Sequence, residues 1–265
     1  MISFEDLAVA AEAPEITALD IAAFGADDIV NLILQRSEII ADQPRPGKIV
    51  GAWSEGDDGP ARDLVDRMGE VLARRAAAVI WLEYQRLKPL LARLSPRSIA
   101  DIGCGYAIFD LFFWRDFPGR VVLIDLEQSE DRHFGYRETG AAYSSLSVAR
   151  AFLKANGVKA GQITAINPER KDPASIRPVD LAVSFLSCGF HYPIETYLEF
   201  FRTAVVPDGA VIVDFRARKA RAGAEILGAM GEVALVEHSA SGNGRRLLLR
   251  KGVRRAPKSV RAGGS

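Results

Sequence analysis

Short apolar runs separated by amphipathic stretches make up the chain after Pro96, and this alternation constrains the fold more than any other feature. The runs are SIADI (98–102), VVLID (121–125), ITAIN (163–167), DLAVSFL (180–186), AVIVDF (210–215), VALVEH (233–238) and RLLLR (246–250). Helical spacing lies between the earlier runs, at 108–115, 143–155 and 194–205. Apolar strands that alternate with helices are typical of a mainly parallel sheet covered on both faces. Residues 96–252 are therefore predicted to form one seven-stranded α/β domain.

The last two runs are joined in a different way, because only SASGNG separates them. A glycine-containing loop this short makes a hairpin, whereas a parallel connection needs a helical crossover. The final strand is therefore predicted to run antiparallel to its neighbour.

The first 95 residues are predicted to be helical, because most of their apolar residues recur at helical spacing. Pro89 should bend this helical region or start a new helix, and Pro96 should end it. Residues 42–61 contain three prolines and four glycines, so we expect a loop there. Amphipathic helices need a partner surface. Residues 1–95 are therefore predicted to form a helical cap that helps to bind the substrate.

Charge and cysteine usage exclude several classes of protein. The 34 basic and 34 acidic residues balance, so no overall charge attracts nucleic acid. Residues 253–265 are basic and rich in Gly, Pro and Ser, which predicts a disordered tail. Cys104 and Cys188 lie outside any CxxC pair, which predicts reduced thiols and no metal site. With no signal peptide and no long apolar stretch, we expect a cytoplasmic protein without a membrane partner.

A glycine turn follows the first predicted strand, in the segment Asp101-Ile-Gly103-Cys104-Gly105-Tyr106-Ala107. Glycine lets a backbone turn sharply and approach a ligand closely, and the next helix offers unpaired N–H groups at its start. The second strand ends in Asp125, where an acid can accept hydrogen bonds from ribose hydroxyls. The dinucleotide pattern GxGxxG would require glycine where this chain has Ile108. A tight turn with a capping aspartate is the purely structural alternative.

The segment ADIGCGYA resembles the hhDhGxGxG motif of the class I S-adenosylmethionine-dependent methyltransferases, with Ala107 at the third glycine. Asp125 corresponds to that family's second-strand acid, and VVPDGAVIVDF is similar to its fifth-strand signature, with Asp208 in place of a glycine. The antiparallel last strand is also typical of the family. The resemblance covers residues 96–252 and implies a Rossmann-like sheet and S-adenosyl-L-methionine as cofactor.

The resemblance also implies which residues bind that cofactor: Asp101, Gly103, Cys104, Gly105, Tyr106, Asp125, Leu126, Asn167, Pro168 and Phe185. Asn167 and Pro168 would contact the adenine ring. A strand-ending Asn-Pro turn explains these two residues equally well.

Two histidines are candidates for a catalytic base. His191 follows the fourth strand in SFLSCGFHYP (184–193), at the edge of the sheet that faces a ligand crevice. A histidine can take a proton from an alcohol near neutral pH, although a loop histidine bonded to the backbone is the alternative. Tyr192 beside it is a candidate substrate contact. His133 is the second candidate base.

The segment that contains His133, residues 126–142, is longer than ordinary connections and predicts a lid, with a flexible loop as the alternative. Arg132 and Tyr136 within it are candidate substrate contacts. Together with the segments around Asn167 and His191, it is similar to a bacterial group of sugar O-methyltransferases.

The sequence therefore predicts a methyltransferase acting on an oxygen of a small, sugar-like or other natural-product acceptor. An RNA methyltransferase, suggested by the basic tail, is one alternative, but no RNA-binding motif supports a nucleic-acid partner. A cofactor-binding protein without catalysis is the other. A homodimer is left open.

Overall fold

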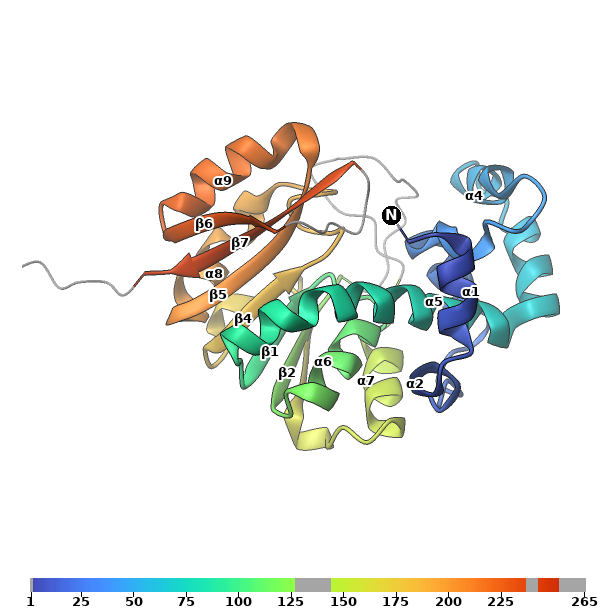
Figure 1. Cartoon of the computed structure of the whole chain (residues 1–265), viewed down its shortest axis with the longest axis horizontal. Helices are drawn as coiled ribbons and strands as arrows, with labels where there is room; N and C mark the ends of the chain where they lie inside the picture. The colour runs from blue at the N-terminus through green and yellow to red at the C-terminus, as the bar shows by residue number, and fades with distance from the viewer. Residues whose placement is uncertain (1, 127–143, 237–242, 253–265) are drawn as a thin grey trace, which may run out of the picture.

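Seven strands pair into one twisted sheet in the order β3-β2-β1-β4-β5-β7-β6 (Figure 1). The structure is a computed structural model that describes residues 2–126, 144–236 and 243–252. The strands are β1 (Ser98–Ile102), β2 (Arg120–Ile124), β3 (Ile163–Ile166), β4 (Val179–Ser184), β5 (Val205–Arg216), β6 (Gly231–Val236) and β7 (Gly244–Lys251). The first five strands are parallel to one another, whereas β7 is antiparallel to both β5 and β6. The predicted mainly parallel sheet with an antiparallel last strand is confirmed.

Among the described residues, four α-helices lie between these strands, three of them at the predicted stretches 108–115, 143–155 and 194–205, whereas the fourth, α9, was not predicted. They are α6 (Ile108–Asp116), α7 (Leu146–Ala155), α8 (Leu198–Thr203) and α9 (Ala220–Gly228). The chain runs from β1 outward to β2 and β3, then returns to place β4 on the other side of β1. In such a sheet, a ligand crevice forms beyond the carboxyl ends of the strands at this change of direction. The site is therefore expected at the ends of β1, β2 and β4.

The N-terminal region consists of helices gathered around one long helix, α5 (Gly59–Leu94). The others are α1 (Phe4–Ala11), α2 (Pro14–Thr17), α3 (Ala26–Gln35) and α4 (Pro46–Ser54), with a 3₁₀ turn, η1 (Ser37–Ile40), after α3. In Figure 1, α5 reaches from this helical group along the sheet region. At 36 residues it is about 54 Å long. This length lets one helix take part in both regions.

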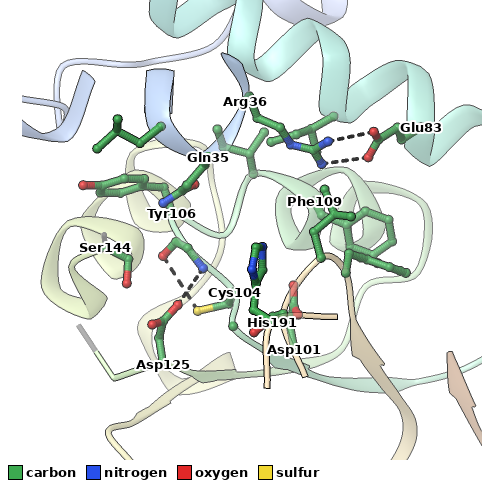
Figure 2. Close-up of a pocket in the computed structure, with 18 of the residues that line it drawn as sticks. Gln35, Arg36, Glu83, Asp101, Cys104, Tyr106, Phe109, Asp125, Ser144 and His191 are labelled. Atoms are coloured by element: carbon green, nitrogen blue, oxygen red, sulfur yellow. Dashed lines mark hydrogen bonds and ion pairs between the residues drawn. The ribbon is translucent and has the colours of Figure 1, made fainter. Parts of the chain in front are cut away.

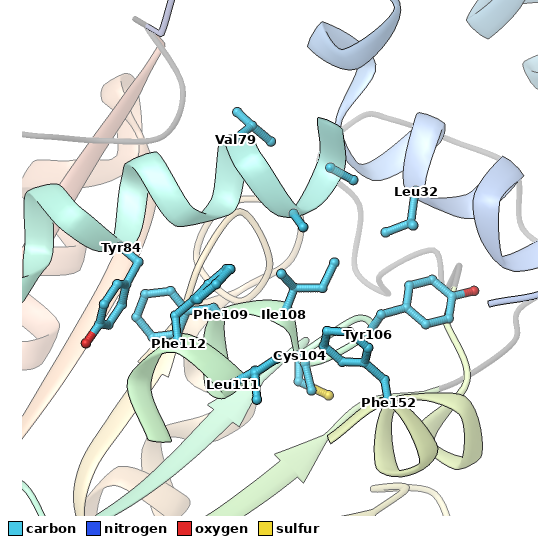
Figure 3. Close-up of a cluster of buried hydrophobic side chains, with 14 of the residues drawn as sticks. Leu32, Val79, Tyr84, Cys104, Tyr106, Ile108, Phe109, Leu111, Phe112 and Phe152 are labelled. Carbon is cyan, nitrogen blue, oxygen red and sulfur yellow. The ribbon is translucent and has the colours of Figure 1, made fainter. Parts of the chain in front are cut away.

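A shared hydrophobic core joins the N-terminal helices to the sheet region. Leu32 from α3 and Val79 from α5 belong to the same buried cluster as Leu111 from α6 and Val121 from β2. Figure 3 shows the α5 side chains above those of α6. The ring of Tyr84 packs edge-on to that of Phe109, with 5.6 Å between the ring centroids. Such aromatic contacts stabilise the contact between the two regions.

The loop predicted over residues 42–61 is wrong, and so is a new helix starting at Pro89, whereas a bend at Pro89 stays a prediction. Residues 42–61 are not a continuous loop, because α4 begins at Pro46, where the ring's fixed φ suits the first turn of a helix. Trp53 in this helix is buried. Pro89 does not divide the long helix either, since α5 continues through it to Leu94. Extensive packing of α5 against its neighbours outweighs the backbone hydrogen bond that a proline removes.

No helix within the described ranges is long and apolar enough to cross a membrane. The predicted disordered tail, residues 253–265, lies outside the described residues.

Candidate functional site

The glycine turn after β1 is held against the end of β2 by two hydrogen bonds that its backbone N–H groups donate. The Gly103 N–H donates to the carbonyl oxygen of Ile124 at 2.7 Å. The Gly105 N–H donates to Oδ2 of Asp125 at 2.9 Å. Both glycines have positive φ, 75° and 55°, a conformation that L side chains rarely adopt. The sequence pattern thus brings the turn and the second-strand acid into direct contact.

Most of the predicted site residues surround one cavity at the carboxyl ends of β1, β2 and β4 (Figure 2). The β1 end and its turn contribute Asp101, Gly103, Cys104, Gly105 and Tyr106. The end of β2 contributes Asp125, and the chain after β4 contributes Phe185, His191 and Tyr192. Residues from three separate parts of the sequence therefore meet where the order of the strands changes direction.

The remaining predicted residues do not line this cavity or lie outside the described residues. Leu126, Asn167 and Pro168 are absent from its lining. The Asn167 side chain instead donates to the Leu126 carbonyl oxygen at 3.1 Å and accepts from the Glu169 N–H at 2.9 Å. These bonds fit the strand-ending turn that the sequence left as an alternative, and the adenine contact stays a prediction. Arg132, His133 and Tyr136 lie outside the described residues.

The N-terminal helices supply a wall of the cavity, and the sequence analysis did not name the residues that form it. Gln35 and Arg36 come from the end of α3, and Ile80 and Glu83 come from α5. Arg36 and Glu83 form two parallel hydrogen bonds of 2.8 and 2.7 Å, and each residue is 8% exposed. Figure 2 shows this pair on the side of the cavity opposite the glycine turn. The sequence does carry a signal for this wall: Glu83 is a charged residue inside the apolar helical stretch AAVIWLEYQ.

The loop after β4 is fastened to β1, and this fixes where His191 lies. The Ser184 hydroxyl donates to the Ile102 carbonyl oxygen at 2.9 Å and accepts from the Cys188 N–H at 2.9 Å. The His191 N–H then donates to the Ser187 carbonyl oxygen at 2.8 Å. In Figure 2, the His191 ring lies between the turn that holds Cys104 and the wall formed by the N-terminal helices. The imidazole is therefore placed among the groups that line the cavity.

Tyr192 has a different chemical capacity from its neighbour. Burial, together with Cys188 and Tyr197 nearby, raises the pKa of the Tyr192 hydroxyl well above its ordinary value. Its hydroxyl lies 3.2 Å from the Ser187 hydroxyl. Tyr192 therefore stays protonated at neutral pH, where it can donate a hydrogen bond but cannot serve as a base.

Two buried carboxyl groups follow the first strand. Asp101 lines the cavity and is 4% exposed, whereas Asp110 in the first turn of α6 is fully buried and does not line the cavity. Burial raises the pKa of Asp101, and the carboxyl groups of Asp110 and Asp125 raise it further. Burial also raises the pKa of Asp110, to about 7. At neutral pH this pair therefore retains a proton that separate aspartates would lose.

Gly103 is needed because the loop after β4 lies against it. A Cβ atom on Gly103 would come within 2.0 Å of the Ser187 Oγ. We expect Gly103→Ala to lower the free energy of unfolding by about 2–4 kcal/mol, combining this overlap with the cost of a positive φ. Urea denaturation measures the change.

The control for this substitution is Gly157→Ala. Gly157 also has a positive φ, of 98°, but a Cβ atom there would meet nothing within 4 Å. Gly157→Ala should lower the free energy of unfolding by about 1 kcal/mol, the cost of the positive φ alone. Equal losses for the two variants would contradict the steric role of Ser187.

The backbone is similar to those of solved methyltransferases, whereas no known protein family and no curated protein matches the sequence. An O-methyltransferase of Nostoc punctiforme is 14% identical, with a TM-score of 0.48 over 68% of this chain and 59% of that protein. The O-methyltransferase TomG of Streptomyces achromogenes, solved with S-adenosylmethionine, is 18% identical, with a TM-score of 0.45 over 64% of this chain and 80% of TomG. The S-adenosylmethionine-dependent methyltransferase SibL is 16% identical, with a TM-score of 0.47 over 84% of this chain and 74% of SibL. This chain spans about three fifths of the length of the Nostoc protein.

Proposed function

We propose that this protein transfers a methyl group from S-adenosylmethionine to an oxygen of a small, sugar-like or other natural-product acceptor. The observation that carries the proposal is the single cavity in which the glycine turn, Asp101, Asp125 and His191 meet. The turn and the acid suit an adenosine cofactor, and the histidine suits an alcohol acceptor. We place the reaction in the cytoplasm, because both cysteines are free and buried.

The polar atoms that line the cavity fit S-adenosylmethionine. Oδ1 of Asp101 and Oγ of Ser144 are buried without a hydrogen-bond partner, although both residues line the cavity. An unpaired buried polar atom costs free energy, which a ligand's ammonium or hydroxyl group would recover. Asp125 at the end of β2 would bind the ribose. The cofactor supplies a methyl group on positively charged sulfur.

The residues of this chain then have separate tasks. Phe109 and Phe185 pack edge-on with 4.7 Å between ring centroids and form an apolar wall that keeps water from the reacting groups. His191 would take the proton of the acceptor hydroxyl, which makes that oxygen a better nucleophile. Holding the acceptor in line with the methyl group supplies much of the remaining acceleration.

We assign the acceptor to the side of the cavity formed by residues 1–95. A buried ion pair contributes less to stability than apolar residues of similar size, so the presence of Arg36 and Glu83 on this wall favours a role in recognition. Their remaining donors and lone pairs, with the Gln35 amide, suit an acceptor with several hydroxyl groups. Residues 96–252 would bind the cofactor, Arg132 and Tyr136 are proposed as acceptor contacts, and His133 is the second candidate base.

The ribose assignment is tested by Asp125→Ala. Loss of charge-assisted hydrogen bonds should weaken S-adenosylmethionine binding by about 1–3 kcal/mol, measured by titration calorimetry. Asp125→Asn is the matched control, because it keeps an oxygen that can accept from the Gly105 N–H while removing the charge. An Asp125→Ala variant with the dissociation constant of the wild type would show that the ribose binds elsewhere.

The reaction itself is tested with S-adenosylmethionine labelled in the methyl group and fractionated cell metabolites. We expect the labelled methyl group in a small neutral metabolite. Mild acid hydrolysis releases the methyl group of a methyl ester as methanol, but it should not release the label from this product. Label in RNA, or in no product despite tight cofactor binding, would refute the proposed acceptor class.

A further inference from the structure

We propose that helix α3 holds the glycine turn in the shape that binds the cofactor: Asn31 and Asp28 are positioning residues that act through the Tyr106 hydroxyl. The proposal rests on the proposed function in naming that cofactor as S-adenosylmethionine. It deepens that function, because it assigns a task to two residues of the N-terminal region that do not line the cavity.

The backbone of the glycine turn needs support from other parts of the chain. Gly103, Gly105 and Ala107 all have positive φ, of 75°, 55° and 59°. Glycine adopts such values freely, whereas the Cβ atom of Ala107 makes this conformation unfavourable. A strained backbone persists only where neighbouring contacts hold it in place. Tyr106 lies between Gly105 and Ala107, so the contacts of its side chain act directly on the strained part of the turn.

Helix α3 supplies these contacts at the Tyr106 hydroxyl. The Asn31 Nδ2 group donates to the hydroxyl oxygen at 2.9 Å, and the hydroxyl donates to Oδ1 of Asp28 at 2.8 Å. Burial, aided by the Asp28 carboxylate, raises the pKa of Tyr106, so the hydroxyl keeps the proton that it donates. The Tyr106 ring also packs edge-on to that of Phe24, with 5.5 Å between the ring centroids. The side chain is therefore fixed at its ring and at its hydroxyl.

One face of α3 carries the residues that support the turn. Asp28, Asn31 and Gln35 are spaced i, i+3 and i+7, which places them on the same side of the helix. Gln35 also reaches the turn, because a Cβ atom on Gly105 would come within 2.9 Å of its Oε1. Asp28 is itself fixed, since its Oδ2 accepts from the Gly25 N–H at 2.8 Å. The helix thus offers the turn a support that is already ordered.

Removing this support should weaken cofactor binding from a distance. Without the hydroxyl contacts, the turn populates other backbone conformations in the free protein. Part of the binding free energy is then used to restore the bound shape, and the apparent affinity falls in proportion to the population that can bind. Asn31 should therefore influence affinity although it does not line the cavity.

The first experiment is titration calorimetry of the full chain with S-adenosylmethionine. Tyr106→Phe keeps the ring but removes both hydrogen bonds, and it should bind at least about fivefold more weakly than the wild type. Asn31→Leu removes the donor at similar volume and should bind at least about threefold more weakly. Asn31→Gln keeps an amide donor and should restore most of the affinity. Wild-type affinity in Asn31→Leu, or equal losses in Asn31→Leu and Asn31→Gln, would overturn the positioning role.

Two further variants show whether Asn31 acts through the hydroxyl. The double variant Tyr106→Phe/Asn31→Leu should bind no more weakly than Tyr106→Phe alone, because the hydroxyl that Asn31 holds is already absent. Additive losses would contradict this route. Asp27→Asn is the matched control on the same helix, because Asp27 pairs with Arg62 at 2.6 Å and its side chain is 79% exposed. It should bind S-adenosylmethionine as the wild type does.

A second measurement needs no ligand. Hydrogen exchange at the Gly105 amide reports how often the turn opens, since this N–H donates to Asp125. Exchange should be at least about fivefold faster in Tyr106→Phe than in the wild type, and unchanged in Asp27→Asn. An unchanged exchange rate in Tyr106→Phe would show that the hydroxyl does not hold the turn.

The two measurements separate this inference from the proposed function. If the wild type fails to bind S-adenosylmethionine, the proposed function falls. The support that α3 gives to the turn would still stand or fall on the exchange rate of the Gly105 amide.

Discussion

His191→Ala should lower the turnover number by about 10²–10⁴, the usual contribution of a positioned base, while S-adenosylmethionine binds as tightly as before. The effect is large because the loop after β4 is fastened through Ser184 and Ser187, so the ring has little freedom to lie elsewhere. A positioned base accelerates the reaction only if it is held near the proton that it removes. Steady-state rates of the purified protein with an acceptor identified by labelling provide the measurement.

The pH dependence identifies which group is the base. Wild-type turnover should fall on the acidic side as the catalytic imidazole gains a proton, and His191→Ala should lose this limb. His133→Ala is the comparison, because His133 is the second candidate base. If His133→Ala alone loses turnover and the acidic limb, the base belongs to residues 126–142. Full turnover in both variants would mean that the acceptor needs no protein base.

Arg36→Met should lower the free energy of unfolding by about 3–5 kcal/mol, because it leaves a buried carboxylate without its partner. Glu83→Met should lower the free energy of unfolding by less than Arg36→Met does, since Arg36 retains Glu38 as an ion-pair partner at 3.6 Å. The double variant should be more stable than either single variant, because it removes both charges together. Urea denaturation of the four proteins gives the coupling free energy between the two residues.

An exposed pair provides the control for these variants. Arg221 and Glu225 form an ion pair on α9 with side chains that are 93% and 68% exposed. Arg221→Met should therefore leave stability unchanged within error, since exposed pairs contribute little. Additive losses in the Arg36 and Glu83 variants would contradict a coupled buried pair. If the double variant binds S-adenosylmethionine normally but methylates poorly, the assignment of this wall to the acceptor is supported.

Local sequence patterns were sufficient to predict the sheet and half of the site. Each strand is an apolar run with its own boundaries, and the short connection before β7 allows only an antiparallel hairpin. The glycine turn lies between a strand and a helix, so its place at the strand end follows from neighbouring residues. Residues 42–61 show the limit of such patterns. Proline and glycine counts favoured a loop, but Pro46 stands at the first position of α4, where proline is accommodated.

The sequence by itself therefore determined the strand pattern, the glycine turn and the acid that follows the second strand. Only the tertiary structure decided that Arg36 and Glu83, 47 residues apart, form one wall of the cavity. It also decided that Ser187 lies against Gly103 and that the Asp110 carboxyl raises the pKa of Asp101. The physical reason is that hydrogen bonds and repulsion between charges depend on distances in space. Periodicity along a chain specifies which face of an element is buried, but not which distant residue it meets there.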